Sequence, residues 1–155
     1  MKGAPKVISV LLVIAGIVVI VAGISTWGVI SGNLRDQRIT VSSDATCAAG
    51  DTVAGPISAY CMAQVIDHHA LAATGGKTYA ELPQNDPQRT VAMNASFLRA
   101  SLFTSVVAYG VAAFAVGMGI VLILIAVALL ALDKRTATAA PAVSGGTTGS
   151  EGATS

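Results

Sequence analysis

Charged side chains are scarce in this sequence. Asp, Glu, Lys and Arg together make up 11% of its 155 residues, against about 25% in soluble domains. A compact soluble fold would have too few charges to cover its surface. Nine basic and eight acidic residues leave a net charge of +1, which does not favour the clustered basic surface of a nucleic-acid-binding protein. The composition therefore indicates a membrane protein with no nucleic-acid partner.

Motifs of common enzyme and transporter classes are also missing. The sequence has no phosphate-binding glycine loop, no nucleophile elbow and no CxxC redox motif. Its long apolar runs contain no ionisable residue, whereas transporters and proton pathways usually carry one inside the membrane. We therefore predict no catalytic residue and no cofactor. An oligomeric pore stays as an alternative, with only a few Ser and Thr side chains to line it.

Apolar residues fall into two long runs, Val7–Ile30 with 24 residues and Leu102–Leu132 with 31. As helices these would be roughly 36 and 46 Å long, and both exceed the hydrocarbon core of about 30 Å. The first run is longer than the apolar core of a signal peptide, so we expect an uncleaved anchor rather than a cleaved leader. The fold class predicted is an all-α membrane protein, with two transmembrane helices in a hairpin and a small helical extracytoplasmic loop domain.

Orientation follows from the segment between the spans. The basic residues near the spans number four on each side, so the positive-inside rule does not decide by count. Both cysteines lie between the spans, and paired cysteines are typical of exported segments. We therefore expect a multi-pass protein of the plasma (inner) membrane, divided into a cytoplasmic N-terminus 1–6, a first span 7–30, an outside loop 31–101, a second span 102–132 and a disordered cytoplasmic tail 133–155.

Two helices are predicted in or from the loop. Apolar residues recur at helical spacing from Pro56 to Ala73, with proline at the start and Gly75-Gly76 after the end. Asp86-Pro87 predicts the start of a second helix near residue 87, and nothing breaks it before the second span. Its apolar stripe of Val91, Ala95, Leu98 and Leu102 is expected to pack against the first helix.

Cys47 and Cys61 enclose a loop of about 15 residues, and a disulfide there would contribute on the order of 3 kcal/mol. Free buried thiols, or metal or redox chemistry, are the alternatives.

Small and aromatic residues mark the spans. Gly16 and Gly23, like Gly110 and Gly117, are seven residues apart, and such residues let helices approach closely in a membrane. They predict a tight hairpin seam or a face for another subunit, although glycine is also common in membrane helices. Aromatic side chains near the loop-side ends of the spans are expected to act as interface anchors; they are Trp27, Phe97 and Phe103.

Asp67, His68 and His69 are the residues that most resemble a metal site. Neighbouring residues of a helix point about 100° apart, and ligand pairs on one face need a spacing of three or four. The three are therefore weak metal candidates, and solvated polar residues on a helix surface are the favoured interpretation.

The segments ITVSSDA, AGDTVAGPISAY, HALAATGGKTYAEL and SFLRASLFTSVVAYGVAA, which lie between Arg38 and about Gly119, resemble a family of small actinobacterial membrane proteins. Members have two spans and one exported loop, and many carry the name "aromatic ring-opening dioxygenase". The resemblance implies this topology and an actinobacterial source. The name implies a non-haem iron oxygenase, whose metal commonly takes two His and one carboxylate on one face. The consecutive residues Asp67, His68 and His69 do not offer that arrangement.

Together these patterns predict a non-catalytic accessory or scaffolding subunit in the lipid bilayer. Its partner would be a larger membrane protein or a second copy, and an iron oxygenase or an oligomeric pore is the alternative.

Overall fold

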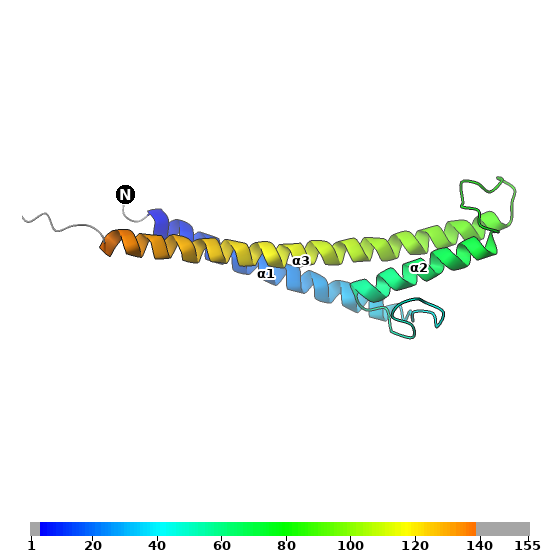
Figure 1. The fold of residues 1–155 in the computed structure, drawn as a ribbon, viewed down its shortest axis with the longest axis horizontal. Helices are drawn as coiled ribbons and strands as arrows, with labels where there is room; N and C mark the ends of the chain where they lie inside the picture. Colours follow the sequence, from blue (N-terminus) through cyan, green and yellow to red (C-terminus); the bar gives the residue numbers. More distant parts are fainter. Residues whose placement is uncertain (1–3, 139–155) are drawn as a thin grey trace, which may run out of the picture.

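The computed structural model describes residues 4–138. They form three α-helices, α1 (Ala4–Asp36), α2 (Pro56–Ala73) and α3 (Gln88–Thr138). Within this range the only strand-like pairing is a single bridge between Thr40 and Thr52, so the all-helical prediction is confirmed. Figure 1 shows an elongated molecule in which α1 lies along one half of α3 and α2 along the other half.

Helices α1 and α3 are long and apolar enough to cross a membrane, over Lys6–Asp36 and Gln88–Lys134. Only 17% of the most apolar stretch of α1 and 11% of that of α3 are buried inside the protein. A core helix of a soluble protein would bury most of such a stretch.

Both helices are longer than the apolar runs that define them in the sequence. α1 continues to Asp36 and α3 to Thr138, so the first residues of the predicted tail are helical. The rest of that tail, 139–155, and residues 1–3 lie outside the described part of the chain.

Helices α1 and α3 run antiparallel and touch at small residues. A Cβ atom on Gly16 would lie 2.7 Å from the carbonyl oxygen of Gly119, and one on Gly119 would lie 2.6 Å from that of Gly16. About two turns further along α1, a Cβ on Gly23 would lie 2.8 Å from the carbonyl oxygen of Ala112 on α3. No real Cβ fits at such distances, so this approach of the two backbones requires glycine.

The helix ends follow local chemistry. Pro56 occupies the first turn of α2, where its missing N–H costs nothing. Beyond its end, Gly75 and Gly76 have positive φ angles of 64° and 83°, and the Gly76 N–H donates to the Leu71 carbonyl at 2.7 Å, which closes the last turn. At the start of α3, the Asp86 carboxylate accepts the Gln88 N–H at 2.9 Å, a typical N-cap.

Helix α2 packs on α3 over only part of the stripe that the sequence suggested. Leu102 is buried, as is Ala92 outside the stripe, whereas Leu98 is 55% exposed and Val91 47%. The prediction was wrong for Leu98 and Val91 because Arg99, which is not part of the stripe, turns toward α2 and pairs with Asp67. The side of α3 that faces α2 is therefore the side that carries Arg99, and Leu98 does not lie on it.

We predict that Gly119→Ala weakens the packing of α1 on α3 and lowers the free energy of unfolding by roughly 1–3 kcal/mol, the usual cost of overpacking. The measurement is the unfolding of the detergent-solubilised protein, followed by circular dichroism. Gly28→Ala is the matched control, because no heavy atom lies within 4 Å of a Cβ there and alanine favours a helix. Equal stability of the two variants would contradict the close approach.

Candidate functional site

The hydroxyl of Tyr109 joins three segments of the chain. Tyr109 is 1% exposed, and its hydroxyl donates to the Ala54 carbonyl at 3.1 Å. Its oxygen also lies 2.8 Å from the Ser31 hydroxyl. Since the single proton of Tyr109 is used on Ala54, the Ser31 hydroxyl is the donor in that second bond. Helix α1, helix α3 and the chain just before α2 therefore meet at one buried oxygen atom.

Apolar packing surrounds this junction. The ring of Trp27 meets that of Tyr109 edge-on, with centroids 4.7 Å apart. The 37–55 segment folds over the end of α1 by backbone pairing, in which the Val41 N–H donates to the Asp51 carbonyl at 2.9 Å and the Val53 N–H to the Ile39 carbonyl at 2.9 Å. Both valines are almost fully buried. They share one core cluster, whose fully buried members are Leu34, Val41, Val53, Ala59, Cys61, Ala63, Leu102 and Tyr109.

Cys47 and Cys61 lie at disulfide distance, with Cα atoms 5.7 Å apart. No free cysteine is present among the described residues. The pair links the 37–55 segment to the second turn of α2, within the same core cluster that contains Tyr109. The pair therefore ties this segment to α2 within the shared core.

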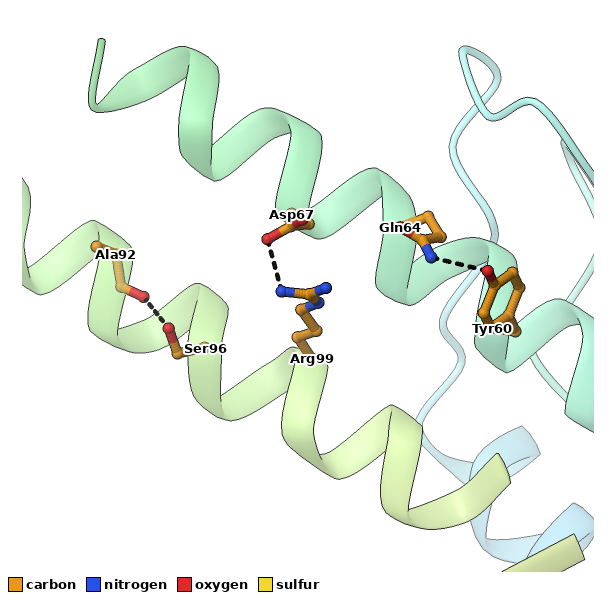
Figure 2. A network of polar contacts seen from close by, with 6 residues as sticks. All are labelled: Tyr60, Gln64, Asp67, Ala92, Ser96 and Arg99. Atoms are coloured by element: carbon orange, nitrogen blue, oxygen red, sulfur yellow. Dashed lines mark hydrogen bonds and ion pairs between the residues drawn. The ribbon is translucent and has the colours of Figure 1, made fainter. Parts of the chain in front are cut away.

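The consecutive residues Asp67, His68 and His69 point to different partners. The Asp67 carboxylate accepts a hydrogen bond from Arg99 Nη1 at 2.9 Å across the α2–α3 gap, as Figure 2 shows. His69 Nε2 instead pairs with the Asp44 carboxylate at 2.5 Å, and the rings of His68 and His69 are 6.0 Å apart. In the described part of the chain, no group of three or more His, Cys, Asp or Glu side chains is arranged to hold a metal ion.

The pKa of the Asp44 carboxyl is lowered by its hydrogen bonds. The Ser42 hydroxyl, followed by His69, lowers the pKa of the Asp44 carboxyl to about 2, since both hydrogen bonds favour the charged form. The carboxylate is therefore ionised at neutral pH. It ties the 37–55 segment to the far end of α2.

Further side-chain contacts within and between α2 and α3 surround the Asp67–Arg99 pair. Arg99 lies over the ring of Phe103, 5.4 Å from its centroid, and Phe103 meets Tyr60 edge-on at 6.0 Å. In Figure 2 the Gln64 amide donates to the Tyr60 hydroxyl at 3.0 Å. A hollow of about 340 Å³ lies beside this network and is lined by both helices and by Lys77. Two of its charged groups, Asp67 and Arg99, already neutralise each other.

The predicted seam glycines separate into two pairs. Gly16 and Gly23 face α3, whereas no heavy atom lies within 4 Å of a Cβ built on Gly110 or Gly117. The partner of Gly16 is Gly119, two residues beyond Gly117. Gly110 and Gly117 lie on an exposed side of α3, and the contact between α1 and α3 does not include them.

The predicted anchors also differ from one another. Trp27 packs on Tyr109 but is 40% exposed. Phe103 packs between Tyr60 and Arg99 and against the core cluster. Phe97 is 66% exposed. Sequence reasoning missed the roles of Tyr109, Ser31 and Arg99; the one available signal was that each is a polar residue near the end of an apolar run.

Searches against protein-family models, curated proteins and solved structures find no significant match to this chain. The resemblance to the actinobacterial membrane proteins stays a prediction. A function for this chain therefore has to be inferred from its own sequence and structure.

We predict that Tyr109→Phe costs about 1–3 kcal/mol of stability, because the Ala54 carbonyl and the Ser31 hydroxyl both lose a buried partner. Tyr60→Phe is the control, since it removes a hydroxyl whose bond is exposed, and it should cost less than about 0.5 kcal/mol. Equilibrium unfolding in detergent measures both. A Tyr109→Phe variant as stable as the control would show that the junction does not hold the three segments together.

Proposed function

We propose that this chain is a non-catalytic integral membrane protein that serves as a small accessory or scaffolding subunit of a larger membrane or cell-envelope complex. Helices α1 and α3 form a transmembrane hairpin in the plasma (inner) membrane. Both termini are cytoplasmic, and residues 31–101 form a helical cap outside. The disulfide Cys47–Cys61 is a staple of that cap.

The apolar surface of α1 and α3 supports the membrane part of this proposal. Large apolar side chains on α1 are mostly half or more exposed along its whole length, from Val7 at 61% to Val29 at 63%. In water such a surface would drive aggregation, whereas in a bilayer lipid tails cover it at no cost. Backbone groups need no solvent there, because each helix satisfies its own hydrogen bonds.

The observation that carries the scaffolding role is the continuity of α3. This helix runs for 51 residues without a break, so its outer part is a direct extension of the span. From Leu102 to Gln88 it extends about 21 Å beyond the predicted span. Helix α2 braces this part through the Asp67–Arg99 ion pair and the Tyr60–Phe103 contact. A braced rod holds a partner at a fixed height and orientation above the membrane, which is what a scaffold requires.

The topology predicts which lysine is accessible from outside. Lys77 is the one lysine of residues 31–101, and the others are Lys2, Lys6 and Lys134. In intact spheroplasts a membrane-impermeant amine reagent should modify Lys77 alone, as detected by peptide mass spectrometry. The control Lys77→Arg should show no labelling until the membrane is permeabilised. Labelling of Lys134 in intact cells would contradict the orientation.

The scaffolding role predicts a stable membrane partner. We expect purification of the tagged chain in mild detergent to recover at least one membrane protein at near-stoichiometric yield, with metal content measured on the same sample. Ala100→Pro should reduce recovery of the partner about tenfold while the chain stays in the membrane, because proline interrupts the rod. Stoichiometric iron without any partner protein would contradict the proposal and favour the oxygenase alternative.

A further inference from the structure

One face of α3 carries large apolar side chains beyond the end of α1. Ser31 of α1 lies beside Tyr109, so the last residue of α1, Asp36, is level with about Thr104. Phe97 lies seven residues further out, about 10 Å beyond that level, and it is 66% exposed. Figure 1 shows α3 continuing past the end of α1. Lipid tails around the proposed span do not reach Phe97, which leaves this outer part of the face open to another protein surface.

The spacing of these exposed residues is that of a coiled-coil seam. Met93, Phe97, Ala100 and Thr104 follow one another at intervals of four, three and four residues. The same alternation continues without interruption to Ile125, and every residue at these positions is uncharged and exposed. Side chains at such intervals pack knobs-into-holes between two helices. We propose that a second copy of this chain docks here, with the two α3 helices parallel.

The seam lies on the free side of α3. Ala112 and Gly119 contact α1, and Tyr109 is buried beside it. At 100° per residue, these three residues point about 130–170° away from the centre of the seam. A second copy can therefore approach without displacing α1. Gly110 and Gly117, which have no neighbour of their own within 4 Å of a Cβ, flank the seam and leave room for the partner helix.

Charge and length favour a second copy as the occupant. The chain has no charged residue from 100 to 132, and the two arginines of outer α3 are directed elsewhere, Arg99 to Asp67 and Arg89 to the Leu82 carbonyl. Two identical faces thus meet without like-charge repulsion. The seam is about 48 Å long, and a strip about 10 Å wide buries about 1,000 Å² over both copies, the lower range of specific interfaces.

The proposal rests on the proposed function, because the membrane holds two copies parallel and at the same height. A twofold axis along the membrane normal then pairs each seam residue with its own equivalent. Without a membrane, nothing would fix the relative height of the two α3 helices, so the same residues would not be held opposite each other.

The test places a photo-crosslinker in native membranes. Phe97→benzoylphenylalanine should give an adduct of two copies in at least tenfold higher yield than Leu98→benzoylphenylalanine. Leu98 is the matched control, since it is the next residue, is 55% exposed and points about 100° away. Phe97→Glu should reduce co-purification of two differently tagged copies at least tenfold, because it sets two carboxylates face to face. Leu98→Glu should change it less than twofold.

Alkaline extraction of the same membranes separates the two proposals. If the chain stays in the membrane pellet but forms no adduct of two copies, the seam proposal is wrong and the membrane proposal stands. The same conclusion follows if the chain stays in the pellet and its adduct contains a different protein. A chain that leaves the pellet overturns both.

Discussion

Helices α1 and α2 both pack against α3 and not against each other, so the whole chain depends on α3 being one unbroken helix. Helix α1 packs along the C-terminal half of α3, and α2 packs along its N-terminal half. The 37–55 connection between α1 and α2 closes over the point where these two halves meet. Tyr109 lies at that point, with its hydroxyl shared between Ser31 of α1 and the Ala54 carbonyl just before α2.

Different interactions stabilise the two halves of α3, because the proposed topology places one half in lipid and the other in water. In the proposed membrane the hydrophobic effect gives no drive for helix association, so α1 and α3 depend on close backbone approach at Gly16 and Gly119. Outside, the cap is too small to bury much apolar surface. It is held by a compact core, the Cys47–Cys61 tie and the Asp67–Arg99 pair. The proposed second copy would cover the exposed apolar face of α3 that includes Phe97.

Local signals in the sequence predicted the helices well, but not the faces by which they pack. Pro56, Gly75 and the Asp86 cap act on their own neighbours, so their effects could be read directly. The choice of Gly119 over Gly117 depends on the rotation of α1 against α3, and both glycines satisfy a small-residue spacing. The Tyr109 hydrogen bonds join residues 78 and 55 positions apart, and no local pattern reports such a contact. Arg99 was left out of the apolar stripe, and its pairing was missed because its partner Asp67 is on another helix.

The continuity of α3 makes the proposed exported cap and the proposed span one rigid unit. Amide hydrogen exchange of the protein in lipid nanodiscs tests this most directly, read peptide by peptide over residues 98–112. Amides on both sides of Thr104 should be protected to a similar degree, as in a continuous helix. A stretch of fast exchange between residues 100 and 106 would instead show a hinge in α3, and the proposed cap and span would then not be one rigid unit.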